Sequence, residues 1–133
     1  MTRHDVIKIH YPNAAISVNH YLGRRKDGGY YVVPECKQWK IGFQWLLKKC
    51  RLEEYNLPIE VTCSGYFKDE RSAPDLSNLS KVILDAIEEL TGINDKNFHW
   101  HDGERVVGVK DSPYLLITLT DDAIKTTKQR KVK

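Results

Sequence analysis

The chain has few of the features that mark secreted, membrane-spanning or zinc-binding proteins. Its 133 residues include only three cysteines, an odd number, and no two of them form a CxxC pair, so neither a disulfide framework nor a zinc knuckle is indicated. No apolar run approaches the length of a membrane span. The first residues, MTRHDVIKIH, lack the apolar stretch of a secretion signal. We therefore expect a cytoplasmic protein without a membrane partner.

Internal repeats and linkers are also absent, and the length is that of one domain. The apolar fraction of 41% is enough for one packed core, and the net charge of +3 is small. The basic residues nevertheless cluster, in 23–29 (GRRKDGG), 47–51 (LKKCR) and 125–133 (KTTKQRKVK). Such clusters can mark a polyanion partner, although they also serve solubility. We expect one domain over residues 1–122, followed by a basic, flexible tail over 123–133.

Hydrophobic periodicity predicts a small mixed α/β (α+β) domain. Alternation predicts strands at 5–11, 30–33, 57–67 and 114–119, and a strand with a turn at Asp102-Gly103 within 98–110. Spacings of three and four predict two helices, one from Pro34 to Cys50 and one over 73–90. Gly92 is a natural C-cap for the second helix. The order β-β-α-β-α-β-β predicts a mixed sheet packed with two main helices.

The second predicted helix has a polar side with a distinctive set of residues. On a helical wheel Asn78, Lys81 and Asp85 fall within about 60° of each other, and Asp75 lies about 60° away at the helix start. Each residue has an ordinary structural explanation as well. Asp75 is a good N-cap, and Lys81 and Asp85 form an i,i+4 pair.

A further carboxylate, Asp95, follows the helix in the segment NDKN. Carboxylates from separate elements beside a lysine suit a magnesium-dependent site for phosphodiester cleavage. Mg²⁺ prefers a few carboxylates and keeps several waters, and such ions activate water and neutralise charge on the scissile phosphate. Lys81 can hold that phosphate as a point charge. Spacing alone does not tell whether Asp95 reaches the Asp75 end of the helix.

The order of these residues resembles the RusA family of Holliday junction resolvases, small homodimeric endodeoxyribonucleases common in phages and prophages. The family's central motif places acids, an Asn and a Lys before an apolar stretch with a further Asp. This chain has DLSNLSKVILDAI, so Asp75, Asn78, Lys81 and Asp85 fall on the motif. Earlier residues follow the family's order too: Pro12, Asn19, Tyr21, Arg24-Arg25-Lys26 and CKQWK. The resemblance covers roughly residues 6 to 120.

The resemblance implies an acidic pocket shared across a dimer, Mg²⁺ binding with Mn²⁺ as an alternative ion, and symmetrical nicking of four-way DNA junctions. It implies that Asp75 and a second acid hold the metal, with Lys81 at the scissile phosphate and Asn78 as an orienting residue. Two features depart from the family pattern. Ser77 replaces the second acid of the motif, and no Asp-Asp pair follows the helix. Asp95 fits the family's spacing for that pair, whereas Asp102 needs an insertion; we favour Asp95, and both stay open.

A basic hairpin is the predicted DNA-binding element. Residues 24–29 (RRKDGG) look like a hairpin tip, and 30–33 (YYVV) like its returning strand. Arginine and lysine contacts to phosphate dominate DNA affinity and make it salt-dependent. The expected backbone contacts are Arg24, Arg25, Lys26, Lys81, Lys128, Arg130 and Lys131.

Three residues on strands have competing interpretations. Glu60 is either a solvent-facing strand residue or the carboxylate that replaces the one missing at Ser77. His99 and His101 point to the same side of a strand. They are exposed strand residues, DNA-facing groups or transition-metal ligands.

The leading hypothesis is a Mg²⁺-dependent, structure-selective endodeoxyribonuclease that resolves Holliday junctions in DNA recombination and repair. A homodimer is expected because a four-way junction has two strands to cut and matches two-fold symmetry. The alternative is a catalytically impaired, branched-DNA-binding protein of the same fold, which Ser77 and the missing Asp-Asp pair favour. A small α/β protein with an unrelated partner would require the motif match to be coincidental.

Overall fold

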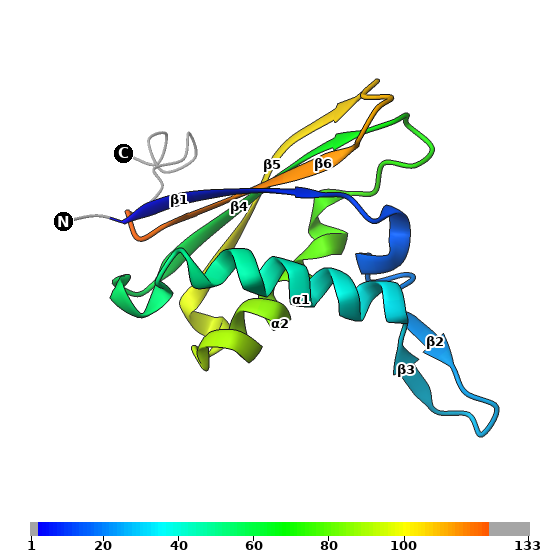
Figure 1. The fold of residues 1–133 in the computed structure, drawn as a ribbon, viewed down its shortest axis with the longest axis horizontal. Helices are drawn as coiled ribbons and strands as arrows, with labels where there is room; N and C mark the ends of the chain where they lie inside the picture. The colour runs from blue at the N-terminus through cyan, green and yellow to red at the C-terminus, as the bar shows by residue number, and fades with distance from the viewer. Residues whose placement is uncertain (1–2, 123–133) are drawn as a thin grey trace, which may run out of the picture.

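The computed structural model describes residues 3–122, which form a four-stranded sheet with two helices on one face (Figure 1). The strands of this sheet are β1 (His4–His10), β4 (Ile59–Phe67), β5 (Phe98–Val107) and β6 (Tyr114–Thr120), in the order β1-β6-β4-β5. β6 is antiparallel to both of its neighbours, whereas β4 and β5 are parallel. The predicted mixed sheet with two main helices is therefore confirmed.

The core lies between the sheet and the two helices, α1 (Pro34–Lys48) and α2 (Ser80–Thr91). Pro34 occupies the first turn of α1, as predicted, because the N–H that proline lacks would have no intrahelical partner there. Trp39 and Phe43 of α1 stack with ring centroids 5.1 Å apart, and the Trp39 indole donates to the carbonyl of His10, 3.0 Å away. Burying an aromatic side chain such as Phe43 contributes about 1.5–3 kcal/mol. This face of α1 therefore holds the helix against β1.

Helix α2 is the crossover that the parallel pair β4 and β5 requires. Its buried residues are Val82, Ile83, Ala86 and Ile87. Gly92 ends the helix with φ of 76°, as predicted, because glycine adopts a left-handed C-cap without a steric penalty. The short turns η3 (Leu76–Leu79) and η4 (Asp95–Asn97) flank α2. The crossover thus places Asp75 just before these elements and Asp95 just after α2.

The predicted hairpin is confirmed, but its strands form a small sheet of their own. β2 (Leu22–Arg24) pairs with β3 (Tyr30–Val32), and Figure 1 shows this hairpin projecting from the body beside the start of α1. Gly23 leaves room for the ring of Tyr31, which a Cβ at that position would meet. The element order is therefore β-β-β-α-β-α-β-β, with one more strand than the sequence predicted.

Two local predictions are wrong. The second helix does not run unbroken from residue 73, because η3 precedes α2 and the junction residue Leu79 has φ of −95° and ψ of −10°. The hydroxyl of Ser80 donates to the carbonyl of Ser77 at 2.8 Å, which stabilises this tight turn. Asp75 and Asn78 therefore lie on the approach to α2 and not on the α-helix itself.

The predicted turn at Asp102-Gly103 is a β-bulge instead. β5 is continuous through these residues, and its register on β4 slips between Cys63, opposite Asp102, and Gly65, opposite Arg105. β5 thus carries one residue more than β4 across this stretch. A Cβ on Gly103 would meet the hydroxyl of Ser64 and would lie 3.0 Å from the carbonyl oxygen of Cys63. Glycine is needed here for close approach of two strands, not for a turn.

The sequence also predicts that no segment spans a membrane and that the chain ends in a basic tail. Within residues 3–122, no helix combines the length and apolarity needed to span a membrane. Two minor turns complete the structure, η1 (Asn13–Ile16) and η2 (Leu52–Glu54). The predicted basic tail over 123–133 lies outside the described residues.

Candidate active site

Three segments that are distant in the sequence meet at the N-terminal end of α2. The backbone N–H of Val18 donates to the carbonyl of Asn78 at 2.9 Å, which joins the segment before the hairpin to η3. η3 also packs against β4 and β5. The N–H of Asn78 donates to the carbonyl of Asp75 at 3.0 Å and closes the first turn. The motif segment is thus held from both sides, with its polar residues at the surface.

The side chain of Asp75 does not cap the turn that follows it. It occupies the N-cap position of η3 with an extended backbone, yet its side chain makes no capping hydrogen bond. The residue is exposed. Within residues 3–122 its carboxylate takes part in no hydrogen bond or ion pair. The capping explanation of this acid is therefore wrong, and the carboxylate oxygens are open to a ligand.

Lys81 and Asp85 form the predicted i,i+4 ion pair, with Nζ 3.0 Å from Oδ2. The hydrogen bond to Asp85 and the negative charge of Asp85 raise the pKa of Lys81, and the Tyr21 hydroxyl and Asp95 add smaller contributions. Lys81 is therefore cationic at neutral pH. The same contributions place Tyr21 and Asp95 within electrostatic range of its ammonium group. Lys81 thus pairs with Asp85, and the negative charge of Asp95, which follows the helix, also acts on its ammonium group.

Asp95 and Asp102, the two candidates for the second acid, differ in their surroundings. Asp95 is exposed in η4, and its side chain has no hydrogen-bond partner within the described residues. Its neighbour Asn94 caps that turn by accepting from the N–H of Lys96 at 3.0 Å. Asp102 instead accepts a hydrogen bond from the indole N–H of Trp100 at 2.7 Å. Of the two carboxylates, that of Asp95 is therefore the one without a hydrogen-bond partner among the described residues.

Asp102 nevertheless lies on the helix side of the sheet. It is opposite Cys63 in the β4–β5 register. Burial, together with the negative charge of Asp102, raises the pKa of the Cys63 thiol to about 12. η3, which follows Asp75, packs against the same strand β5. Asp102 thus lies on a strand that packs against the turn after Asp75, whereas the turn of Asp95 packs against α2.

The donor atoms of the candidate acids determine which kind of metal ion they suit. In the part of the chain that the structure describes, no three His, Cys, Asp or Glu side chains converge to hold a metal ion. Mg²⁺ does not require such a cage, because it is commonly held by one or two carboxylates together with substrate phosphates and waters. Exposed oxygen donors such as Asp75 and Asp95 fit that mode. They suit Mn²⁺ as well, but not softer ions such as Zn²⁺ or Cu²⁺, which favour nitrogen and sulfur ligands.

Neither interpretation of Glu60 holds. Its exposed fraction is only 5%, so it is not a solvent-facing strand residue. Its carboxylate contacts His99 Nδ1 at 2.8 Å and His101 Nε2 at 2.7 Å. Because its neighbours Ile59 and Val61 face the core, Glu60 lies on the face of the sheet opposite the two helices. It therefore does not replace the carboxylate missing at Ser77, and the two histidines share a face, as predicted.

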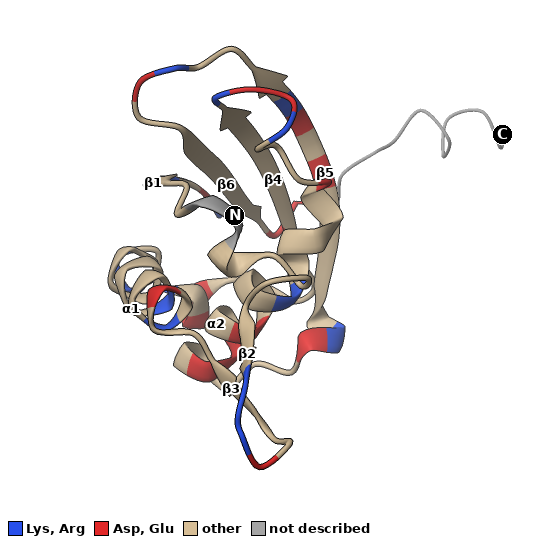
Figure 2. Ribbon diagram, turned by 90° about the vertical axis from the view of Figure 1, so that its right-hand side faces the viewer, with Lys and Arg blue, Asp and Glu red and all other residues tan. Residues whose placement is uncertain are grey.

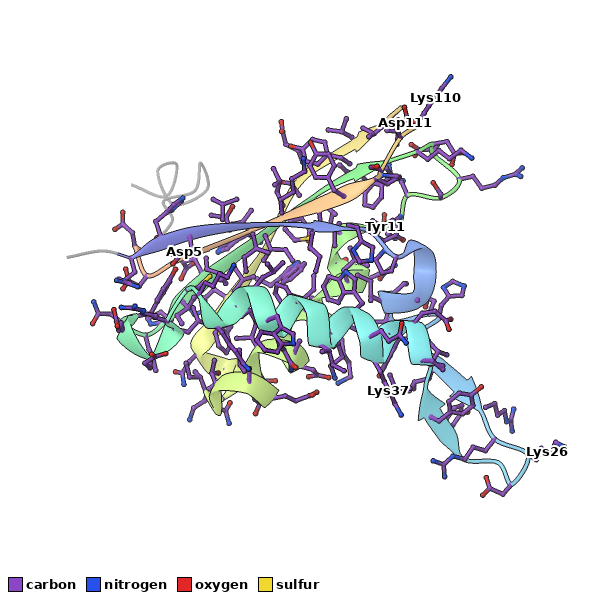
Figure 3. All side chains as sticks on the ribbon, in the orientation of Figure 1. Asp5, Tyr11, Lys26, Lys37, Lys110 and Asp111 are labelled. Atoms are coloured by element: carbon purple, nitrogen blue, oxygen red, sulfur yellow. The ribbon has the colours of Figure 1, made fainter. Side chains whose placement is uncertain are left out.

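The basic residues of the hairpin are exposed. Arg24, Arg25 and Lys26 make no ion pair within residues 3–122. Figure 2 shows this basic stretch in blue on the projecting hairpin, and Figure 3 shows Lys26 at its tip, pointing away from the body. Lys128, Arg130 and Lys131 lie outside the described residues. The structure thus presents three of the predicted DNA contacts on an accessible arm.

Sequence reasoning missed one residue of this region, Arg105. Its guanidinium donates to the carbonyls of Ala73 and Pro74, at 2.7 and 3.0 Å, immediately before Asp75. The signal was present in the sequence only as a Gly103 inside a strand pattern, which can mark a bulge.

Comparison with known proteins identifies the family. The family model described as Endodeoxyribonuclease RusA matches residues 12–119, a range that includes the hairpin, the motif segment and both candidate acids. A search of the curated proteins found no match. Nucleases of this family resolve Holliday junctions and are generally metal-dependent. The chain belongs to the RusA family of endodeoxyribonucleases, as its motif had indicated.

Proposed function

We propose that this protein nicks four-way DNA junctions with Mg²⁺ held by Asp75 and Asp95. The observation that carries the proposal is the carboxylate of Asp75, which is exposed at the start of the crossover and has neither a capping role nor an ion-pair partner among the described residues. An acid that contributes nothing to the helix start is available for a ligand. Asp95 is the second acid because its carboxylate also has no hydrogen-bond partner among the described residues, and because its negative charge acts on the ammonium group of Lys81.

When bound, the ion activates water and neutralises charge on the scissile phosphate. The protein's own residues bind and orient the DNA strand. Lys81, kept cationic by Asp85, contacts the scissile phosphate and stabilises charge that develops in the transition state. The amide of Asn78, on the turn that Val18 anchors, orients the phosphate or a water beside Asp75.

The hairpin supplies the grip on DNA outside the site. Arg24, Arg25 and Lys26 contact backbone phosphates of a junction arm, which suits their exposure on a projecting element. Lys128, Arg130 and Lys131 belong to the same proposed surface on the strength of the sequence alone. Two copies are required for paired nicks, so a homodimer with two-fold symmetry is part of the proposal.

A catalytically impaired junction-binding protein is the second candidate. Ser77 stands where the family has an acid, and the described residues contain no converging group of three metal-binding side chains. A hydroxyl at Ser77 can hydrogen-bond a water but cannot supply charge. Asp102 could provide a further carboxylate through Oδ2, because its bond from Trp100 engages only Oδ1.

A cleavage assay separates the two candidates. The protein is incubated with an end-labelled four-way junction, and with linear duplex as control, in Mg²⁺, in Mn²⁺ and in EDTA. The proposed nuclease gives paired nicks on the junction that require metal. Selective binding of the junction without nicks in any metal would establish the impaired protein instead. Equal binding of junction and duplex without nicks would contradict both candidates.

A further inference from the structure

Arg105 is tied to the segment that carries Asp75 by a fork of hydrogen bonds. Its Nη2 donates to the carbonyl of Ala73 at 2.7 Å, and its Nε to the carbonyl of Pro74 at 3.0 Å. Its Nη1 faces both carboxylate oxygens of Glu70, at 3.0 and 3.1 Å. The side chain of Arg105 is 30% exposed, whereas that of Glu70 is 75% exposed. The contact to the Ala73 carbonyl is part-buried, whereas the contacts to Pro74 and Glu70 are exposed.

The segment that Arg105 contacts is closed by a turn at its start, where the Ser72 N–H donates to Asp69 Oδ1 at 2.8 Å, but it has few backbone hydrogen bonds next to Asp75. Residues 68–75 form no helix or strand, and Pro74 has no N–H to donate. The N–H of Ala73 reaches the carbonyl of Glu70 only at 3.4 Å. Planar guanidinium groups present several donors in a fixed geometry, so one arginine can hold two successive carbonyls. The carbonyls of Ala73 and Pro74, just before Asp75, are thus both bonded by a side chain from another element.

The β-bulge explains why Arg105 points to this segment. In a regular register the residue opposite Gly65 would be Glu104, because Asp102 is opposite Cys63. The extra residue in β5 puts Arg105 opposite Gly65 instead, on the helix side of the sheet. Bulges re-aim side chains in this way and are frequent next to active sites. Gly103 permits the bulge, since a Cβ there would meet the Ser64 hydroxyl.

We propose that Arg105 is a positioning residue for the nuclease reaction, which fixes the backbone of Ala73 and Pro74 and thereby the direction of the Asp75 carboxylate. This inference rests on the proposed role of Asp75 in metal binding. Arg105 touches neither metal nor DNA in this role. In this proposal the bulge at Gly103 directs Arg105 to the two carbonyls, and Arg105 in turn directs the Asp75 carboxylate.

The test uses the full chain with Arg105→Lys, which keeps the positive charge and the aliphatic stem but cannot hold both carbonyls. Glu70→Gln is the matched control, because it removes the exposed ion pair and leaves both carbonyl contacts in place. Amide hydrogen exchange is measured on the metal-free proteins. Cleavage of the junction is then followed over a series of Mg²⁺ concentrations.

We expect faster exchange at residues 75–79 in Arg105→Lys, with unchanged exchange in α1 and the sheet. We also expect the Mg²⁺ concentration for half-maximal cleavage to rise roughly tenfold to hundredfold, as for other residues that orient a metal ligand. High Mg²⁺ should restore most of the rate, and Glu70→Gln should behave as the wild type. Wild-type exchange and an unshifted Mg²⁺ dependence in Arg105→Lys would overturn the proposal, as would an equal loss in Glu70→Gln.

Asp75→Asn in the same assay separates this inference from the proposed function. Unimpaired cleavage by Asp75→Asn would remove the proposed function and the inference together. Loss of cleavage in Asp75→Asn, with normal behaviour of Arg105→Lys, would remove only the role of Arg105. If the wild type binds junctions without cleaving them, the exchange measurement alone decides whether Arg105 fixes the segment.

Discussion

Replacing Arg24, Arg25 and Lys26 with glutamine tests the hairpin as the element that grips DNA. The three side chains are exposed and make no ion pair within residues 3–122, so folding stability should change by no more than about 0.5 kcal/mol. Each phosphate contact on duplex DNA contributes about 0.9 to the slope of log affinity against log salt, so three contacts contribute about 2.7. Between about 50 and about 150 mM salt, the wild type should therefore lose roughly twentyfold more affinity than the variant.

Fluorescence anisotropy with a labelled four-way junction in EDTA measures this slope without cleavage. The matched control replaces three exposed lysines of α1 and its C-cap, Lys37, Lys48 and Lys49, which changes the net charge by the same amount. If the hairpin makes direct contacts, the control should change the slope far less than the hairpin variant. Equal slopes for both variants would show that the hairpin makes no direct phosphate contacts, because the effect would then come from the overall charge.

Three other changes have outcomes that the structure specifies. Lys81→Met should lower single-turnover nicking by about 10²–10³-fold with junction binding retained, since it removes one charge that stabilises the transition state; normal nicking would exclude Lys81 from catalysis. Asp121→Asn should lower the melting temperature at neutral pH, because backbone N–H groups of Asn56 and Arg3 hold the pKa of Asp121 below its ordinary value. That stabilisation is present above the ordinary pKa of 3.8 and is lost as the pH falls through the lowered one, so the difference between variant and wild type should close in acid. Glu60→Gln should destabilise the fold by about 1–3 kcal/mol in thermal unfolding, because the Glu60 carboxylate is buried and its contacts to His99 and His101 would be altered, and it should leave nicking unchanged; loss of nicking by the folded variant would place Glu60 in the site.

The regular elements could be predicted because their signals are local. The alternation of Ile59, Val61 and Cys63 reflects one buried face of a strand, and Gly92 marks the end of a helix by its left-handed backbone. The start of α2 could not be placed in this way. A 3₁₀ turn and an α-helix share their apolar spacing over one turn, so the helical wheel treated Asp75 and Asn78 as part of one continuous helix.

The candidate site was predicted in part because its motif is contiguous. Asp75, Asn78, Lys81 and Asp85 lie within one segment, and the i,i+4 pair of the last two follows from helix geometry. Contacts between neighbouring strands could not be predicted from the sequence. The burial of Glu60 depends on two histidines from the neighbouring strand, and the direction of Arg105 depends on a bulge that shifts one strand against another. Register shifts of this kind are set by tertiary packing and leave only a glycine as their trace in the sequence.

The central claim is that the carboxylate of Asp75 holds the metal that cleaves the junction. The most direct test is single-turnover cleavage of a four-way junction by Asp75→Asn in Mg²⁺, with junction affinity measured in EDTA on the same protein. We expect no nicks above background and junction affinity equal to or tighter than that of the wild type, because the substitution removes a negative charge and leaves the fold intact. Nicking near the wild-type rate would contradict it, since the open carboxylate at the start of the crossover would then have no part in the reaction.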